Sequence, residues 1–292
     1  MSESAHETGA RPDLFFKAKS AGAIGPIEKR RSLAVRLWDN GTFRKTLILV
    51  ALASAWELYA RHLDNDLLFP TFGQTLTAFF TETTNGTLPE RVWVSLKVLL
   101  TGYGLGILIA ACITVLAQVT RIGDDLLDTL TAMFNPLPAI ALLPLALIWF
   151  GLGAQSIVFV LVHSVLWPVA LNANSGFKSV SPTLRMVGKN YGLSLFATLR
   201  QILVPAALPS LITGLKVGWA FAWRTLIAAE LVFGVSSGSG GLGWFIFENK
   251  NQLEIANVFA GLLTVILIGL AVEGLIFRTI EEKTVRRWGM QS

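Results

Sequence analysis

Three ionisable side chains stand inside long apolar stretches of this chain, where a polar group needs a partner or a purpose. They are His163, Arg224 and Glu230. A charge at the centre of a membrane helix costs about 2.5–3.5 kcal/mol on insertion scales, so such residues face a partner helix, a cavity or a polar pathway. Arg224 is the residue that could attract an anion. We take all three as candidates for a translocation pathway, and a structural contact to another helix is the alternative for each.

A glycine-rich motif could suggest cofactor chemistry, but its context excludes that interpretation. Residues 238–243 satisfy G-x-G-x-x-G. A dinucleotide site needs a strand before this motif and a helix after it. An apolar stretch precedes it instead, so we expect a flexible re-entry loop that leads into a short amphipathic stretch at 244–249. No G-x-x-x-x-G-K-[ST] motif occurs, so we expect no ATP or other cofactor to bind through a P-loop of this chain.

The remaining reactive residues form no catalytic or metal-binding cluster. Asp124, Asp125 and Asp128 lie together but without a histidine, and we interpret them as a solvated loop. The three histidines of the chain are scattered, which leaves no zinc-like ligand set. The single cysteine, Cys112, cannot form a disulfide within one chain. We therefore expect no enzyme activity and no metal site.

The polar loop 176–209 has the residue types of a docking element rather than of a catalyst. Pro182 suits the first turn of a helix that Ser181 caps, and Gly192 can end that helix in a left-handed conformation. Ser194 can cap a second helix. One face of the first helix is apolar, with basic residues elsewhere, and the second has an apolar stripe with Arg200 and Gln201 turned outward. The predicted apolar positions are Leu184, Val187 and Tyr191, then Phe196, Leu199 and Leu203.

Two prolines, Pro205 and Pro209, should end the second helix and start the next apolar stretch. Two short amphipathic helices hinged at Gly192 make a rigid protrusion that can lie in a groove of a soluble partner.

Composition indicates the elements that hold these residues. Of 292 residues, 53% are hydrophobic and 15% are charged, and the mean hydropathy is +0.58. A soluble domain has about 25% charged residues, and stretches such as 98–120 have none. A membrane helix needs about 20 apolar residues. We therefore predict an all-α membrane protein with six transmembrane helices, at about 45–61, 92–118, 128–150, 155–175, 207–233 and 255–279.

The distribution of Lys and Arg predicts the orientation. The segment up to Lys45 holds nine basic residues, whereas the loop 62–90 holds none. The loop 176–206 and the end of the chain are basic again. The positive-inside rule then places both termini and this loop in the cytoplasm. We expect a cytoplasmic leader over 1–44, a transmembrane domain over 45–280 and a cytoplasmic tail over 281–292.

Small residues and prolines punctuate the predicted spans. Gly102 and Gly106 are four residues apart, as are Gly214 and Gly218. This spacing lets helices approach closely in lipid, although glycine is also tolerated in membrane helices without such a contact. Three prolines, at 136, 138 and 144, predict a kinked or late-starting third span, because each removes a backbone donor.

The loop 176–209 resembles the cytoplasmic signature loop of ABC importer permeases, the EAA loop. In that family a helix leads to a glycine and then to an L-P-x-x-x-P ending, and Gly192, Pro205 and Pro209 match these positions, with Val204 in place of the leucine. The opening E-A-A is replaced by the residues at 186–188, which removes the acidic residue that the family places there. The resemblance assigns an ATPase-coupling role to Arg185, Val187, Gly188, Lys189, Tyr191, Gly192, Phe196, Arg200, Pro205 and Pro209.

The resemblance extends over about 60–290. This part of the chain is similar to the nitrate/sulfonate/taurine branch of these permeases. The segments that carry it are 68–71, 95–98 with 102–106, 138–145 with 149–153, 240–243 and 287–288. It implies a type I ABC importer permease fold with cytoplasmic coupling helices, in the inner membrane of a bacterium.

The resemblance also implies the partners and the solute. The implied partners are a second copy of the permease, two cytoplasmic ATPases that bind ATP and Mg, a periplasmic solute-binding protein and membrane lipid, but no nucleic acid. The solute would be a small organic sulfonate, taurine, nitrate or a similar anion. An aromatic carboxylate or a thiamine precursor is an alternative solute, and a secondary transporter is an alternative class.

Overall fold

The computed structural model describes residues 38–233 and 240–286, and every regular element within these ranges is helical. The chain divides into two units, residues 1–54 and 55–292. Most of the predicted leader, residues 1–37, lies outside the described residues, as do the last six residues of the predicted tail. The predicted all-α class is confirmed.

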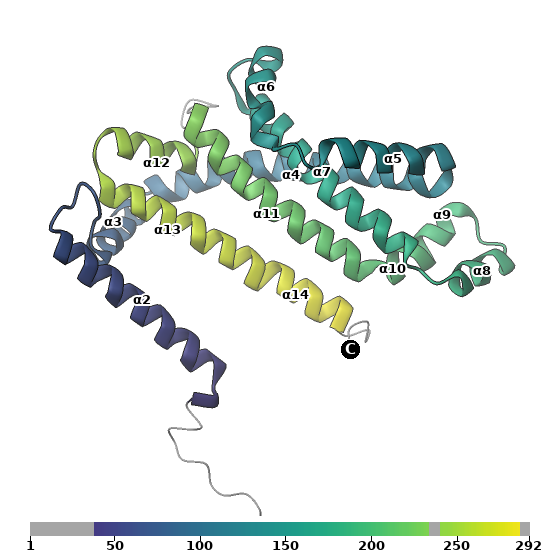
Figure 1. The fold of residues 1–292 in the computed structure, drawn as a ribbon, viewed down its shortest axis with the longest axis horizontal. Coiled ribbons are helices and arrows are strands. Elements are labelled where there is room, and N and C mark those ends of the chain that lie inside the picture. Colours follow the sequence, from purple (N-terminus) through teal and green to yellow (C-terminus); the bar gives the residue numbers. More distant parts are fainter. Residues whose placement is uncertain (1–37, 234–239, 287–292) are drawn as a thin grey trace, which may run out of the picture. The chain divides into compact units, whose positions relative to one another are not determined.

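The described residues form thirteen α-helices, labelled α2 to α14 in Figure 1, and four short 3₁₀ or π segments. The first half comprises α2 Gly41–Leu63, α3 Phe72–Thr84, α4 Thr87–Val119, α5 Arg121–Phe134, η1 Ala139–Leu142, α6 Leu143–Phe150 and α7 Ala154–Lys178. The second half comprises α8 Pro182–Asn190, α9 Leu195–Thr198, η2 Leu199–Leu203, α10 Val204–Ala206, α11 Leu208–Phe233, α12 Leu242–Asn251, α13 Ile255–Ala271, η3 Val272–Phe277, α14 Arg278–Glu281 and η4 Glu282–Arg286.

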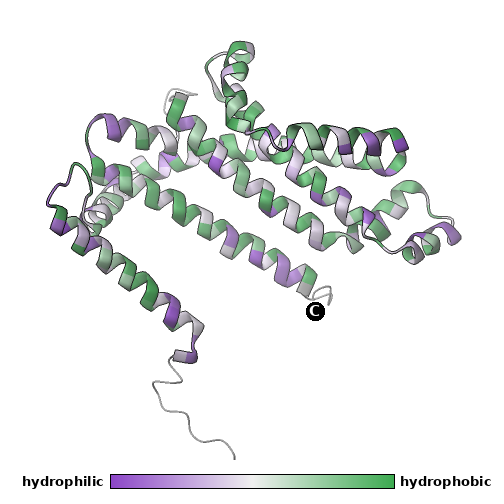
Figure 2. Cartoon of the chain, viewed as in Figure 1, coloured by the Kyte–Doolittle hydropathy of each residue, from purple (hydrophilic) through white to green (hydrophobic). Residues whose placement is uncertain are grey.

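Long apolar helices dominate the described residues. Three are long and apolar enough to cross a membrane, namely 87–119, 154–178 and 255–285. Two bent helix pairs raise the number to five if each pair is one span: α5 with 139–150, and 195–206 with α11. Figure 2 shows the contrast between the largely apolar α6 and α13 and the polar residues gathered on α8. A multi-pass membrane protein is therefore confirmed, and the number of six spans stays a prediction.

The first predicted span corresponds to α2, which is 23 residues long. It is not among the helices that are apolar enough to cross a membrane by themselves. Within the unit 1–54, nearly all of its described side chains are exposed, including the apolar ones from Leu47 to Leu52.

The third predicted span is two helices rather than one. Helix α5 ends at Phe134, and the stretch Ala139–Phe150 leaves it at an angle of 87°. Pro136 and Pro138 occupy the break, and each lacks the N–H that would continue the helical ladder. The expected kink is present as this sharp bend, which separates α6 from α5, whereas α5 packs along α4 because the chain reverses at Thr120 (Figure 1).

Helix α7 is the centre of the unit 55–292, because α4 and α11 both pack on it through glycines. A Cβ at Gly102 would lie 2.5 Å from Leu161 Cβ, and one at Gly106 would lie 2.7 Å from Val165 Cβ. Only glycine permits this approach of α4 to α7. The close-contact interpretation of this glycine pair is thereby confirmed.

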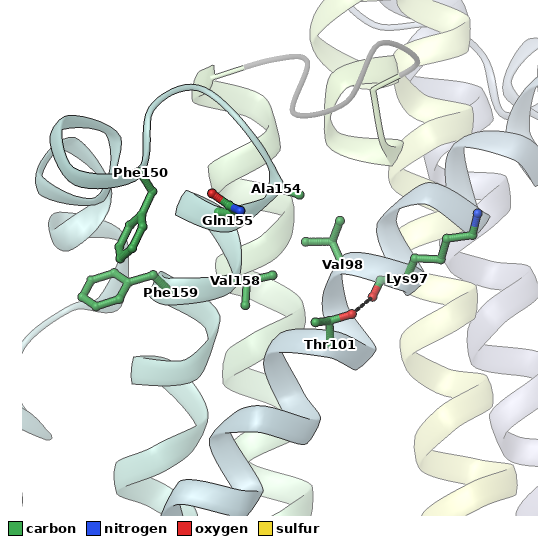
Figure 3. A pocket seen from close by; sticks show the side chains of 8 residues that line it. All are labelled: Lys97, Val98, Thr101, Phe150, Ala154, Gln155, Val158 and Phe159. Carbon is green, nitrogen blue, oxygen red and sulfur yellow. Dashed lines mark hydrogen bonds between the residues drawn. The ribbon is translucent and has the colours of Figure 1, made fainter.

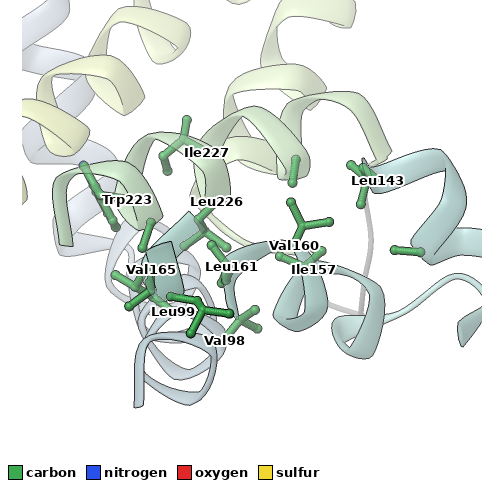
Figure 4. Close-up of a cluster of buried hydrophobic side chains, with 14 of the residues drawn as sticks. Val98, Leu99, Leu143, Ile157, Val160, Leu161, Val165, Trp223, Leu226 and Ile227 are labelled. Carbon is green, nitrogen blue, oxygen red and sulfur yellow. The ribbon is translucent and has the colours of Figure 1, made fainter. Parts of the chain in front are cut away.

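The second glycine pair does the same on the other side of α7. A Cβ at Gly214 would lie 2.8 Å from Asn172 Cβ, and one at Gly218 would lie 2.9 Å from a methyl of Val169. Apolar side chains fill the remaining space between the helices, as Figure 4 shows for Leu99 of α4, Val160 of α7 and Leu226 of α11. These three helices therefore form one closely packed block.

Helix α3 is fixed by a capping box and an aromatic cluster. Thr71 accepts a hydrogen bond from the Gln74 amide, and the Gln74 side chain accepts one from the Thr71 amide. The Trp56 indole donates to the Pro70 carbonyl at 2.9 Å and packs against Phe69 and Phe259. The segment 68–71 thus sets where α3 begins against α13.

Candidate functional site

The loop 176–209 forms the two predicted helices, and their caps are the predicted ones. The Ser181 hydroxyl accepts a hydrogen bond from the Leu184 amide at 3.4 Å, with Pro182 in the first turn of α8. The Ser194 hydroxyl caps α9 by accepting from the Ala197 amide at 3.3 Å. Local side-chain chemistry alone therefore sets where both helices begin.

Gly192 makes the turn between these helices. Its φ is +65°, in the left-handed region that favours glycine. Its amide donates to the Lys189 carbonyl, and the next amide donates to the Gly188 carbonyl, both at 3.0 Å. These two bonds satisfy carbonyls that the end of α8 leaves free.

The two helices pack tightly on each other and on the end of α7. A Cβ at Gly188 would lie 2.7 Å from Ile202 Cδ1, so Gly188 lets η2 reach α8. The Arg185 guanidinium donates to the Phe177 carbonyl at 2.6 Å, which ties α8 to α7. Below them lies an apolar cluster of Phe177, Val180, Leu199, Leu203 and Ala207.

This anchoring leaves a set of large apolar side chains uncovered, which we call the exposed apolar face: Leu184, Met186, Val187, Tyr191, Leu195 and Phe196. Tyr191 is 80% exposed and Phe196 is 72% exposed. The three apolar positions predicted on α8, Leu184, Val187 and Tyr191, are all exposed. The predicted second stripe is divided, because Leu199 and Leu203 are buried whereas Phe196 points outward.

The basic side chains of the loop lie around this face. Lys189 and Arg200 are exposed, and neither forms a salt bridge within the described parts of the chain. A face that combines uncovered apolar groups with free cations suits a protein partner with an acidic rim.

An elbow joins the loop to α11. The chain bends by 76° between 195–206 and 208–232, with Pro205 and Pro209 on either side of the turn at Ala207. The second helix is not uniform, because its middle, η2, is π-helical. No feature of the sequence indicated that irregularity.

His163 lies on α7 beside a cavity of about 350 Å³. Both of its ring nitrogens are buried without a hydrogen-bond partner among the described residues, and so is the indole nitrogen of Trp167 one turn later. Asn135, Asn172 and Thr225 also line this cavity. The sequence identified His163 but not the residues around it.

Arg224 is exposed on α11 and does not meet His163. Its guanidinium lies 5.6 Å from the centre of the Phe221 ring. It lines a separate cavity of about 280 Å³ between α11 and the α13–η3 stretch, together with Glu273. No carboxylate forms a salt bridge with it in 38–233 or 240–286.

Glu230 is 1% exposed and lines none of these cavities. The Ser95 hydroxyl lies 2.8 Å from both of its carboxyl oxygens, and the Gly243 amide donates to one of them at 2.8 Å. The same Ser95 oxygen accepts a hydrogen bond from the Leu242 amide at 2.8 Å. We call these four residues the Glu230 network, which holds the start of α12 against α4 and α11.

The Glu230 network also accounts for the described part of the glycine-rich motif, 240–243, whereas 238–239 lie outside the described residues. A Cβ at Gly241 would collide with the Glu230 carboxyl group, and one at Gly243 would lie 2.6 Å from Glu230 Cβ. These glycines allow close packing around an acid. Arg91 adds a hydrogen bond to the Gly240 carbonyl at 3.2 Å and one to Glu248 at 3.3 Å.

A further cavity, of about 630 Å³, lies between α4 and the start of α7. Lys97, Thr101 and Gln155 are the polar side chains that line it, and Figure 3 shows the Lys97 amine directed away from Phe150 and Phe159. Lys97 contacts the Trp93 ring at 5.1 Å. Lys97 directly precedes the uncharged stretch 98–120 but was not among the predicted site residues.

The three aspartates are not a solvated loop, which corrects the earlier interpretation. They lie on α5, and Lys178 at the end of α7 pairs with Asp124 at 2.8 Å and Asp128 at 3.2 Å. These ion pairs hold α5 against α7. In the described part of the chain, no group of three His, Cys, Asp or Glu side chains could hold a metal ion.

Comparison with known proteins gives a consistent result. Residues 102–282 match the family described as binding-protein-dependent transport system inner membrane component. A putative ABC transporter permease of Methanocaldococcus jannaschii is 31% identical, over 88% of this chain and 96% of its own. A nitrate import permease of Synechocystis is 25% identical over 89% and 95%, and the taurine transport permease of Escherichia coli is 28% identical over 77% and 82%.

Proposed function

We propose that this chain, which belongs to the family of binding-protein-dependent transport system inner membrane components, carries a small oxyanion as the permease subunit of an ATP-driven ABC importer. The observation that carries the proposal is the exposed apolar face, held rigidly on α8 and α9 and joined to α11 by the elbow. A protein does not keep Tyr191 and Phe196 so exposed beside free cations without a partner to cover them.

The partner at this face is a cytoplasmic ATPase subunit, which binds ATP and Mg. Short amphipathic helices bind grooves by their apolar residues, and α8 has Leu184, Val187 and Tyr191 outward. Gly188 and Arg185 take no part in that contact, because both are committed to packing inside the loop. In this chain they shape the docking element rather than touch the ATPase.

The complete importer contains two copies of this chain, two ATPases and a periplasmic solute-binding protein. Both termini and the loop 176–209 lie in the cytoplasm, as the basic residues favour. The transmembrane domain extends over 45–280, with the leader and tail on the cytoplasmic side. The membrane is the inner membrane of a bacterium.

The solute is a small anion of the sulfonate or nitrate type. The two relatives named for a solute carry taurine and nitrate, which share a compact oxyanion group. Arg224 forms no salt bridge within the described residues and lines a cavity together with Glu273; we assign to it the attraction of the anion. His163 lies beside a separate polar cavity, whereas Glu230 is bound up in its network and acts as a structural residue.

Transport follows from the connections between these parts. ATP binding closes the two ATPases and moves α8, which is fixed to η2 at Gly188 and to α7 at Arg185. The elbow passes the motion to α11. Because glycines of α4 and α11 pack closely against α7, these three helices move together. The pathway then opens alternately to the two sides of the membrane by rigid-body rotation.

The test is uptake by the reconstituted complex. The permease, its ATPase and its binding protein are placed in proteoliposomes, and ATP hydrolysis and uptake are measured with taurine, nitrate and an aromatic carboxylate. We expect ATP-driven uptake of a sulfonate or nitrate that requires the binding protein. Uptake by the permease alone, driven by an ion gradient, would contradict the importer.

A further inference from the structure

The cavity beside His163 has the composition of a binding site for a small solute. Its walls come from three places: the break between α5 and η1, the middle of α7, and α11. Irregular backbone at membrane depth is tolerated where it lines a cavity, and transporters place solute sites at interrupted helices. The volume of about 350 Å³ is in the range of small-molecule sites.

Pro168 of α7 also lines this cavity. It lies inside the helix, and because it has no N–H, the Ser164 carbonyl loses its helical donor. The Asn172 amide donates to the Pro168 carbonyl at 2.8 Å, which leaves its side-chain oxygen for other contacts. Both Ser164 and Asn172 line the cavity. A helix with an internal proline and polar side chains thus faces a broken one.

Three buried nitrogen atoms beside the cavity have no hydrogen-bond partner among the described residues: both ring nitrogens of His163 and the indole nitrogen of Trp167. Trp167 is 7% exposed. A buried donor without a partner is costly, and such groups are rare in native proteins unless a ligand or another conformation satisfies them. The two side chains are one helical turn apart on the same face of α7, and both line the cavity.

The Phe134 ring packs against both side chains in this conformation. It stacks on the Trp167 ring at 5.4 Å and meets the His163 ring edge-on at 6.3 Å. Phe134 is the last residue of α5, directly before the break. A movement at the break would therefore move the ring that packs on Trp167 and His163.

The charges around the cavity indicate which ligand it would take. No Asp, Glu, Lys or Arg lines it, so no charged side chain in its wall repels a ligand of either charge. Its indole and imidazole supply N–H donors, and Arg224 lies on α11 between the lining residues Phe221 and Thr225. Neutral donors with a nearby cation favour an anion but bind it weakly enough to release it.

We propose that this cavity is a transit site for an oxyanion, whose oxygens accept hydrogen bonds from Trp167 Nε1 and from His163 once Phe134 has moved aside. The inference rests on the proposed function, because it names the place where the transported anion stops. Binding breaks no covalent bond. The anion exchanges its hydration for these donors and leaves when Phe134 returns.

The first experiment compares two tryptophans in the reconstituted complex. Trp167→Phe removes the N–H and retains an aromatic ring of similar shape. Trp149→Phe makes the same change on α6, at a residue that is 58% exposed and lines neither this cavity nor the one beside Arg224. We expect Trp167→Phe to reduce the uptake of taurine or nitrate at least tenfold while ATP hydrolysis stimulated by the binding protein remains. Trp149→Phe should leave uptake within twofold of wild type.

The second experiment detects occupancy without relying on transport. Ser164→Cys, in a background with Cys112→Ser, places a thiol in the cavity wall. We expect a methanethiosulfonate reagent to modify it, and millimolar taurine or nitrate to slow the reaction at least threefold. Modification without protection means that the cavity holds water only, which overturns the proposal.

The outcomes separate the two levels of inference. If the wild-type complex shows no ATP-driven uptake, the proposed function fails first. If wild-type uptake is normal and Trp167→Phe and Trp149→Phe behave alike, the transit site fails and the importer stands.

Discussion

Helix α11 begins at the loop 176–209 and ends beside α12. The regions at its two ends differ in whether their key side chains are exposed or buried. At the start, large apolar groups such as Tyr191 and Phe196 are left uncovered. At the end, the Glu230 carboxyl group is fully buried, and hydrogen bonds from Ser95 and Gly243 satisfy it. The first region is incomplete without another protein, whereas the second is complete within one chain. A substitution should therefore affect assembly in one region and stability in the other.

The largest effect should come from Gly192→Pro. Proline fixes φ near −65° and has no N–H, whereas Gly192 has φ +65° and donates to Lys189. We expect complete loss of ATPase stimulation and uptake, with the membrane helices still inserted. ATPase copurification and protease accessibility of the loops measure both. Gly192→Asn is the control, because asparagine tolerates the left-handed region; if it too abolished coupling, the backbone conformation would not be the cause.

Gly241→Ala should be the most destabilising change at the other end of α11. The new methyl group would collide with the buried Glu230 carboxyl group, and overpacking of this kind costs about 3 kcal/mol. Gly104→Ala is the matched control, since a Cβ there has no neighbour within 4 Å. Thermal unfolding of the detergent-purified permease compares the two. Equal stability of both variants would show that the glycine motif is not needed for packing.

Glu230→Gln should have a smaller effect in the same place. Its amide would direct an N–H₂ group at a carboxyl position where Ser95 now donates, and one unsatisfied buried donor costs about 2 kcal/mol. Ser95→Ala removes the same bond from the other side. Because both belong to one network, the double variant should lose less stability than the sum of the two single variants. An additive result would mean that the two residues act independently.

Phe196→Ser should produce the smallest effect and should leave stability unchanged. The side chain is 72% exposed, so its loss costs the isolated permease little. We expect about tenfold weaker binding of the ATPase, in the range of truncations at interface positions. Leu152→Ser is the control, at a leucine that is 80% exposed in the α6–α7 connection. Weakened binding in both variants would remove the assignment of the docking face.

Local chemistry explains what could be predicted from the sequence. The caps at Ser181 and Ser194, the left-handed Gly192 and the elbow between Pro205 and Pro209 each depend on residues within a few positions. The glycine spacing likewise indicated close helix packing, although it did not indicate that α7 is the partner on both sides.

Contacts between distant residues explain what could not be predicted. Ser95 and Glu230 are 135 positions apart, and neither residue type nor spacing connects them. The aspartates of α5 read as a loop because their partner, Lys178, comes 50 positions after Asp128. The cavity beside His163 needs three elements at once, so the histidine was visible in the sequence and its surroundings were not.

The elbow at Ala207 has a mechanical consequence. The segment 195–206 meets α11 at 76°, so a push along its axis reaches α11 almost sideways. A bell crank changes the direction of a force in the same manner. A movement of the exposed apolar face along the axis of 195–206 would thus become a lateral movement of α11. The closely packed helices α4 and α7 would carry that movement to the other side of the membrane.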